Sequence, residues 1–284
     1  MGPNLLSTLT NPTLRLTPAE QLNDLFEFRP NLEFIRRSFL KAVWGAKSKA
    51  EIEAVIAPHL LEDQLSWYHA QSASIGELSL LRRVAESALF DALSDFAHVV
   101  SNFDATSFVA GPPSPPFEAT VQANWKLMWS HYAQGHRGFG IEIKGSQLAF
   151  EFAKVKGSIL GNVDYVSERP ILTRLAPPQE EIALKEWLES IFLKKDICWK
   201  YENESRVIAP LYASTTVTFP DGEPMHLVKI PPHMIEAIHL GCKCRVNPLA
   251  IRQSLNQIGA ESARVFKWGE SSPANYDLTL EEVA

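Results

Sequence analysis

The chain has 284 residues, of which 45% are hydrophobic, and its formal net charge is -6 at pH 7. This length and apolar content are enough for an ample core, whereas the acidic balance argues against a broad surface that binds nucleic acid. No apolar run approaches the length of a membrane-spanning helix, and the first residues lack the cationic and apolar regions of a secretory signal. Three cysteines are too few for a disulfide framework. We therefore expect a soluble, cytoplasmic protein that does not enter a membrane.

The N-terminal third is expected to be helical, over residues 18–98. Ser48 and Glu51 have the spacing of a capping box, in which the two side chains satisfy amide groups at the first turn of a helix. A set of apolar residues recurs every three or four positions and predicts the buried stripe of a long helix: Leu78, Leu81, Ala85, Ala88, Leu89, Ala92, Leu93 and Phe96. Four prolines within residues 111–116 then predict an extended connection.

Residues 121–270 are expected to be rich in strands. Alternating or β-rich runs predict strands at 139–143, 159–165, 207–212 and 215–230, the last around a turn at 220–222. Residues 179–195 predict a helix with a buried stripe of Ile182, Trp187, Leu188, Ile191 and Phe192. Asn247 followed by Pro248 predicts another helix start. We therefore expect a single α+β domain over residues 1–284, in which a helical N-terminal third precedes a mixed or antiparallel sheet with flanking helices.

A stretch rich in aromatic and basic residues, MWSHYAQGHRGF at 128–139, joins a predicted helix to a predicted strand. Trp125, Met128, Trp129 and Tyr132 share one helical face, which is typical of a surface that packs in the core. The hydroxyl group of Tyr132 nonetheless needs a hydrogen-bond partner, and His131 lies beside that face. This helix end is therefore a candidate site as well as a core surface.

The corner after this helix has the residues of a helix C-terminus. Gly135 suits the C-cap, and His136 and Arg137 would interact favourably with the negative end of the helix dipole. Capping does not explain why Gly138 follows and why a strand begins immediately after it. Such a tight reversal of the chain lets a ligand approach the backbone closely. We therefore include His136 and Arg137 among the candidate ligand-binding residues.

A second candidate is WKYENESRVI at 199–208. If this segment is a strand, alternation places Glu202, Glu204 and Arg206 on one face. On a solvated face, a pair between Glu204 and Arg206 would contribute only about 0 to 1 kcal/mol. In a cleft, adjacent carboxylates cannot both ionise freely, so one of them could serve as an acid or a base while the arginine orients the other.

Other signals do not favour a metal or a nucleotide motif. His239, Cys242 and Cys244 form an H-x2-C-x-C cluster, but a structural zinc site needs four ligands. The sequence has no phosphate-cradling loop, no dinucleotide-binding glycine pattern and no G-x-S-x-G. Asn23 and Asp24, before two phenylalanines, suit a helix start or a turn. We expect no metal ligands.

Taken together, these blocks resemble the domain-of-unknown-function family numbered 2971. The resemblance lies in four segments, taken in chain order: L-N-D-L-F-E at 22–27, M-W-S-H-Y-A with G-F at 128–139, W-K-Y-E-N-E-S-R at 199–206, and residues 235–241. The family often has proline where this chain has Leu25. Its members commonly begin with a strand carrying a tyrosine or histidine, for which residues 1–13 show no counterpart. If that strand contributes to a site, the site here is reduced or differently assembled.

A more distant resemblance is to ADP-ribosyltransferase-like proteins, which hold NAD in a split sheet and use an early aromatic or histidine, a middle polar or aromatic position and a late glutamate. This resemblance implies that Tyr132 or His131 takes the middle position and that Glu204 or Glu202 takes the late one. It is a likeness at the level of the fold. No residue fills the early position.

The leading hypothesis is an enzyme that transfers a glycosyl (ADP-ribosyl) group from NAD or a related nucleotide. Glu204, Glu202 and His131 would be catalytic, and a further set would bind the substrate or cofactor: Trp129, Tyr132, Arg206, His136, Arg137 and Asn23. The alternative is a non-catalytic module that binds a ligand or, through the helical third, a partner protein. A metal-dependent nuclease using Glu142, Glu202 and His131 comes third. All depend on whether the 128–139 and 199–208 segments meet, and we predict that His131 or Tyr132 faces Glu202 or Glu204.

Overall fold

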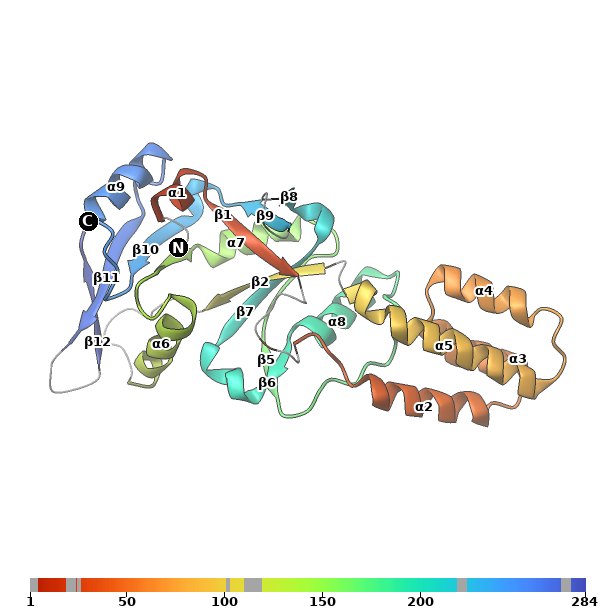
Figure 1. The fold of residues 1–284 in the computed structure, drawn as a ribbon. Coiled ribbons are helices and arrows are strands. Elements are labelled where there is room, and N and C mark those ends of the chain that lie inside the picture. Colours follow the sequence, from red (N-terminus) through yellow and green to blue (C-terminus); the bar gives the residue numbers. More distant parts are fainter. Residues whose placement is uncertain are drawn as a thin grey trace.

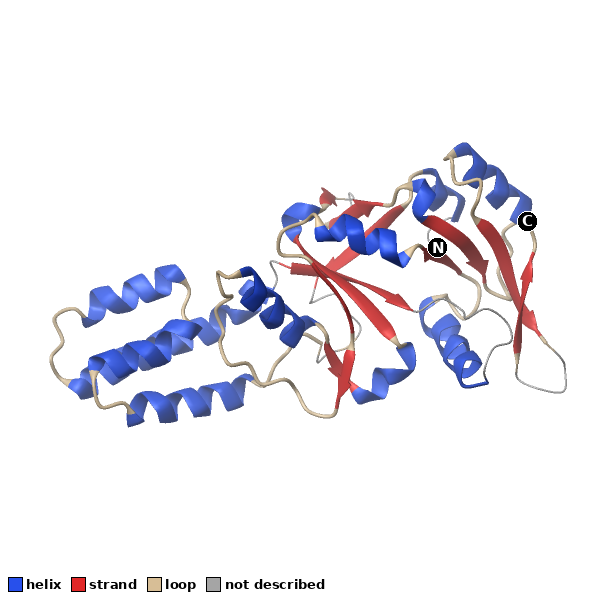
Figure 2. Cartoon of the chain, turned by 180° about the vertical axis from the view of Figure 1, so that it is seen from behind, coloured by secondary structure: helices blue, strands red, loops and turns tan. Residues whose placement is uncertain are grey.

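The computed structural model describes residues 5–18, 24, 27–100, 103–109, 119–218, 224–271 and 277–284. Its architecture is α+β, as the sequence predicts. Sheets and helices form a body, and a group of helices projects from one side of that body (Figure 1 and Figure 2). We call the projecting helices α2 to α5 the helical arm. Both labelled chain ends lie in the body, away from the arm (Figure 1).

The helical arm consists of α2 (Leu32–Gly45), α3 (Lys49–Ile56), a 3₁₀ turn η2 (Ala57–His59), α4 (Glu62–Ser72) and α5 (Leu78–Val100). The predicted cap of α3 is confirmed, because Ser48 Oγ accepts a hydrogen bond from the amide of Glu51 at 3.2 Å. The Glu51 carboxylate accepts from the amide of Lys47, one residue before the cap, at 2.7 Å. The predicted stripe of α5 is also confirmed, since its residues are buried or partly buried in the core of the arm.

Within the described residues, the body contains three sheets. The six-stranded sheet has the order β4 (Ile159–Asn162), β7 (Glu204–Pro210), β2 (Phe103–Val109), β1 (Thr13–Pro18), β9 (Met225–Lys229) and β8 (Thr215–Val217). The four-stranded sheet has the order β12 (Leu278–Glu282), β11 (Arg264–Glu270), β10 (Ile235–Leu240) and β3 (Phe139–Ile143). The two-stranded sheet pairs β5 (Asp164–Val166) with β6 (Lys194–Asp196). The four-stranded sheet is mixed, since β10–β11 is parallel whereas β10–β3 and β11–β12 are antiparallel. The described pairings of the six-stranded sheet are antiparallel, so the prediction of a mixed or antiparallel sheet holds for the two larger sheets, whereas β5–β6 is parallel.

The helices of the body are α1 (Leu5–Thr10), α6 (Ala119–Tyr132), α7 (Gly145–Ala153), α8 (Glu181–Phe192) and α9 (Pro248–Gln257), with 3₁₀ turns η3 (Ile197–Glu202), η4 (Leu211–Ala213) and η5 (Pro232–Met234). The predicted start of α9 is confirmed, since Asn247 Oδ1 accepts a hydrogen bond from the amide of Leu249 at 3.0 Å. Within the residues that the structure describes, no helix is long and apolar enough to cross a bilayer.

The sequence shows no counterpart of the family's first strand in residues 1–13, but the structure has an N-terminal strand, β1, at Thr13–Pro18. Strand β1 pairs with β9 on one side and with β2 on the other, both antiparallel. It carries neither tyrosine nor histidine, and Leu16 is its buried apolar residue. Only Leu14 and Leu16 alternate with polar residues in this short segment, so pairing on both edges contributes more to the strand than its own sequence pattern does.

The predicted strand at 199–208 is wrong in its first half. Residues 197–202 form η3, and β7 begins only at Glu204. The side chain of Asp196 accepts a hydrogen bond from the amide of Cys198 at 2.8 Å and caps this turn. Asn203 then adopts a left-handed conformation, with φ of 47°, which reverses the chain into the strand.

Two other predictions need correction. The predicted strand at 159–165 is divided between β4 and β5, which belong to different sheets. In α8, four residues of the predicted stripe are buried, but Ile182 is 76% exposed. Because α8 begins at Glu181, Ile182 lies in its first turn, ahead of the part that packs in the core. The proline-rich connection at 111–116 and the turn at 220–222 lie outside the described residues.

Candidate functional site

Strand β7 is buried on both faces, and this places two charged side chains inside the protein. Ile208 packs in the core that continues into the helical arm, whereas Val207 packs in the core that α9 covers. Because side chains alternate along a strand, Glu204 and Arg206 share the face of Ile208. They are 4% and 1% exposed. Buried ions need counter-charges and hydrogen bonds, since desolvation costs several kcal/mol for each ion.

The counter-charges come from a buried charged cluster of five residues, Glu27, Lys195, Glu202, Glu204 and Arg206. Lys195 Nζ lies 2.6 Å from Glu202 Oε2, 3.1 Å from Glu204 Oε2 and 3.6 Å from Glu27 Oε1. The guanidinium group of Arg206 contacts both carboxylate oxygens of Glu204 and one oxygen of Glu27. Its Nη1 donates to the carbonyl of Phe192 at 2.8 Å. The cluster therefore joins three carboxylates through two cations.

Aromatic rings lie against both cations of the cluster. The guanidinium carbon of Arg206 is 5.0 Å from the ring centroid of Phe28, and Lys195 Nζ is 4.9 Å from that of Trp199. Phe28 has a φ of 58°, a left-handed conformation that is unfavourable for a bulky residue. Its ring packs on Phe192 at 4.6 Å. These ring contacts help to offset the strained backbone, which follows Glu27 directly.

Burial and charge act in opposite directions on the two cations. Burial alone would lower the pKa of Lys195, but the carboxylates of Glu204 and Glu202 outweigh it and raise this pKa above its ordinary value. Burial lowers the pKa of Arg206 to about 9, although the nearby charge of Asp24 acts to raise it. Both groups therefore carry their charges at neutral pH.

The predicted contact between the two sequence blocks exists. The hydroxyl group of Tyr132, at the end of α6, donates to Glu202 Oε1. Next to it, His131 Nδ1 lies 3.0 Å from the hydroxyl oxygen of Tyr201. Tyr132 is 49% exposed, so the hydrogen-bonded cluster extends from the core to the surface at this point. On its other side, Tyr165 accepts a hydrogen bond from the amide of Glu204 at 2.9 Å.

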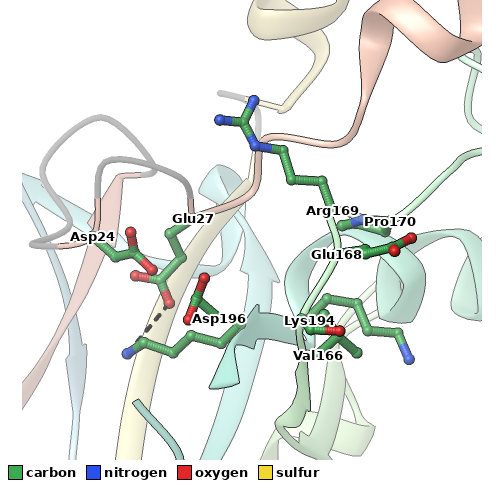
Figure 3. A pocket seen from close by; sticks show the side chains of 10 residues that line it. Asp24, Glu27, Val166, Glu168, Arg169, Pro170, Lys194 and Asp196 are labelled. Carbon is green, nitrogen blue, oxygen red and sulfur yellow. Dashed lines mark ion pairs between the residues drawn. The ribbon is translucent and has the colours of Figure 1, made fainter. Parts of the chain in front are cut away.

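A pocket of about 200 Å³ opens beside the cluster (Figure 3). It is lined by Asp24, Glu27, residues 166–170 and residues 194–196. In Figure 3 the carboxylates of Asp24, Glu27 and Asp196 lie close together, and the guanidinium group of Arg169 lies above them in this view. The dashed line there marks the ion pair between Glu27 and Lys195. The wall of the pocket carries four carboxylates, those of Asp24, Glu27, Glu168 and Asp196, and three cations, Arg169, Lys194 and Lys195, so it has a formal excess of one negative charge.

Asp196 is an exposed carboxylate of this wall. Hydrogen bonds from Cys198, the first of them from its backbone amide, hold the pKa of Asp196 below its ordinary value. Its carboxylate therefore remains ionised at neutral pH and at mildly acidic pH. Because the same carboxylate caps η3, it has a fixed position at the pocket.

Trp129, predicted to bind a ligand, belongs to a small core of its own. It is buried with Ala133, Trp268 and Leu278, and Trp125 packs against them. The rings of Trp125 and Trp268 are stacked, with their centroids 5.6 Å apart. The expected core surface on α6 is therefore confirmed for Trp125 and Trp129 but not for Tyr132, which is 49% exposed, and the buried ring of Trp129 has little area for stacking on a ligand.

His136 and Arg137 form the corner between α6 and β3. The amide of Gly138 donates to the carbonyl of Ala133 at 2.8 Å, and the amide of Lys243 donates to the carbonyl of His136 at 3.0 Å. Burial, together with the charge of Lys243, lowers the pKa of His136. The structure shows no contact of either residue with the buried charged cluster among the described residues, and Asn23 lies outside them.

The three residues of the nuclease hypothesis do not come together. Glu142 pairs with His239, whose Nε2 lies 2.8 Å from Glu142 Oε2, and this hydrogen bond lowers the pKa of Glu142 despite partial burial. Glu202 instead contacts Tyr132 and Lys195. Within the described part of the chain, no group of three or more histidine, cysteine, aspartate or glutamate residues is arranged to hold a metal ion.

Sequence reasoning missed Lys195 and Glu27, which connect the cluster to the pocket. Lys195 sits in the run Lys194-Lys195-Asp196, shortly before the 199–208 block. The available signal was a lysine close in sequence to Glu202 and Glu204, because carboxylates that become buried require a cation. Glu27 gave no such signal, since its proximity to Arg206 depends on the tertiary fold.

One family model matches part of the chain. Residues 128–207 match the family described as a protein of unknown function (DUF2971). This segment contains both the 128–139 and the 199–206 blocks, so the predicted resemblance is confirmed over this part of the chain. No curated protein and no solved structure matches the chain. The matched segment includes Tyr132, Lys195, Glu202, Glu204 and Arg206, and it therefore carries most of the cluster.

Proposed function

We propose that the chain is a non-catalytic ligand-binding module, whose pocket beside Lys195 takes a small cationic group such as an ammonium or a guanidinium. The charge balance carries this proposal. The pocket lining and the buried charged cluster together contain six carboxylates, those of Asp24, Glu27, Glu168, Asp196, Glu202 and Glu204, and four cations, Arg169, Lys194, Lys195 and Arg206. Fully ionised, they have a formal excess of two negative charges, which a bound cation would reduce.

The size of the pocket supports a small ligand. Sites for drug-sized ligands have volumes of about 300 to 1,000 Å³, whereas this pocket has about 200 Å³. A short amine fits this volume, and a complete dinucleotide would extend well beyond it. Glu204 is not a residue that a ligand in the pocket would contact, because its carboxylate bonds to Arg206 and Lys195 and does not line the pocket.

We expect putrescine and agmatine to bind in titration calorimetry, whereas 1,4-butanediol, which has the length of putrescine without its charges, should not. Asp196→Asn should weaken amine binding about fivefold to tenfold, because it removes a charge from the pocket wall while asparagine still caps η3. The matched control is Glu151→Gln, an exposed change on α7. Absence of binding at millimolar amine, or equal affinity for butanediol, would refute the proposal.

A second candidate is NAD-using glycosyl (ADP-ribosyl) transfer, and one observation favours it: Asp24 and Glu27 line the pocket. Glycosyl transfer breaks the bond from the ribose carbon to nicotinamide, which leaves with the bonding electrons, while an acceptor atom forms the new bond and loses a proton. The oxocarbenium-like transition state needs a nearby carboxylate. The nicotinamide ring of NAD is itself cationic, so it suits the same anionic wall.

The two candidates are separated by nicotinamide release from NAD. If the chain is a transferase, Glu27→Gln should abolish release while NAD affinity, measured by calorimetry, changes by less than about threefold. The comparison variant is Glu204→Gln, which tests the residue favoured by the sequence. Amine binding together with no NAD binding at millimolar concentration would support the binding module alone. Release that survives both substitutions would reject these carboxylates as catalytic groups.

A further inference from the structure

Helix α2 forms an outer edge of the helical arm in Figure 1, and Figure 2 shows the same edge from behind. Its inner face packs in the arm through Ile35, Phe39 and Val43. A second line of residues, Phe34, Arg37, Lys41 and Trp44, follows the opposite side at intervals of three and four, so these four side chains share one helical face. We call this line the α2 stripe.

The α2 stripe exposes two large rings with two cations between them. Phe34 and Trp44 are 46% and 44% exposed, and the side chain of Arg37 is 80% exposed. At a rise of 1.5 Å per residue, the two rings are about 15 Å apart along the helix. Exposed aromatic residues and arginine are the residue types enriched in protein interfaces.

The charge of α2 differs from that of the chain as a whole. The helix has three cations, Arg36, Arg37 and Lys41, and one acidic residue, Glu33. Its formal charge is therefore +2, in a chain whose net charge is -6. Helix α4, on the other side of the arm in Figure 1, has two acidic residues in its first turn and no lysine or arginine. The α2 stripe is a local cationic surface.

Neighbouring groups hold these side chains in place. The guanidinium group of Arg82 lies over the ring of Trp44 at 5.7 Å, and Glu33 Oε1 lies 2.9 Å from Nε of Arg37. Side chains that are already ordered lose less conformational freedom when a partner binds. The stripe is therefore preorganised for docking.

We propose that the α2 stripe docks an acidic helical segment of a partner protein. Two carboxylates one helical turn apart would pair with Arg37 and Lys41, which are themselves four residues apart. Apolar side chains at the two ends of the segment would pack on Phe34 and Trp44. This surface is separate from the pocket, so the inference does not depend on which ligand the pocket binds.

Charge complementarity favours a short acidic segment over a nucleic acid or a membrane. Proteins that grip nucleic acid commonly make about 6 to 10 phosphate contacts, and anionic lipid surfaces attract clusters of about 4 to 8 basic residues. The α2 stripe offers two cations, with Arg36 beside them, on a chain that is acidic overall. A segment with two carboxylates matches this number, whereas a polyanion would be repelled by the rest of the surface.

The test uses a fluorescent, alanine-rich helical peptide of about 16 residues, long enough to form a helix in contact with a protein. It carries leucine, glutamate, glutamate and leucine at the spacing of Phe34, Arg37, Lys41 and Trp44. Fluorescence anisotropy measures its affinity for the full chain and for the charge-reversed variant Arg37→Glu/Lys41→Glu. The matched control is Lys154→Glu/Lys156→Glu, a double reversal of exposed residues in the body.

We expect the charge reversal on α2 to weaken peptide binding more than about tenfold, and the control to change it less than about twofold. A peptide with lysines in place of its glutamates should bind the α2 variant and not the wild type, which excludes unfolding as the cause. No binding at millimolar peptide, or equal affinity for the wild type and the α2 variant, would overturn the inference. So would tighter binding of a dodecathymidylate strand or of phosphatidylserine vesicles through the same residues.

Discussion

Replacing Arg206 with methionine will lower the free energy of unfolding by about 3 to 5 kcal/mol. Arg206 is 1% exposed and contacts the carboxylates of Glu204 and Glu27. Methionine keeps much of the length of the side chain but removes the charge, so both glutamates lose a buried counter-charge while Lys195 alone remains. Urea unfolding at pH 7, followed by circular dichroism, measures the change.

A double variant separates loss of pairing from loss of packing. Arg206→Met/Glu204→Met removes a cation together with its principal carboxylate partner, so it should recover part of the stability that Arg206→Met loses. Arg36→Met is the exposed control, and we expect it to change stability by less than about 1 kcal/mol because surface ion pairs contribute little. A loss below about 1 kcal/mol for Arg206→Met would show that the cluster does not stabilise the fold.

The spacing of apolar residues predicted those elements that bury one continuous face. The stripe of α5 and the cap at Ser48 follow from local spacing alone, and the structure has both. The 199–208 segment shows the limit of this reasoning. Its alternation suits a strand, but Asp196 caps a 3₁₀ turn and Asn203 adopts a left-handed conformation before the strand begins. An alternating hydrophobic pattern does not report a side-chain cap or a left-handed residue, so it could not predict this turn.

The site was predicted only where the sequence showed both partners. Tyr132 and Glu202 each lie in a block that combines rings with polar groups, and their hydrogen bond joins the two blocks. The alignment of Glu204 with Arg206 also follows from alternation. Glu27 and Lys195 were not predicted, because their contacts arise only when β6 and the segment before α2 meet beside β7. Periodicity in the sequence does not predict contacts between segments that are far apart in the chain.

His59 gives the protein a stability that depends on pH in the acid range. It lies in η2, where its ring meets that of Phe39 edge-on at 4.9 Å. Burial, followed by the charge of Arg174, lowers the pKa of His59 from 6.5 to about 4. The folded protein therefore keeps His59 neutral at pH values at which the unfolded chain protonates it. Because the unfolded state then binds more protons, the free energy of unfolding falls as the pH falls through this window.

We expect His59 to make the protein lose about 3 kcal/mol of stability between pH 6.5 and pH 4, at about 1.4 kcal/mol for each unit of pKa shift. Below pH 4 the histidine is charged in both states, so its contribution no longer changes with pH. His59→Gln removes the titration, and all carboxylates contribute equally to both proteins. Urea unfolding at intervals from pH 8 to pH 4 measures the difference in unfolding free energy between the wild type and the variant. We expect this difference to be constant above pH 6.5 and to shift by about 3 kcal/mol in favour of the variant as the pH falls from 6.5 to 4. Parallel pH profiles for the two proteins would show that His59 is protonated as readily in the folded protein as in the unfolded chain.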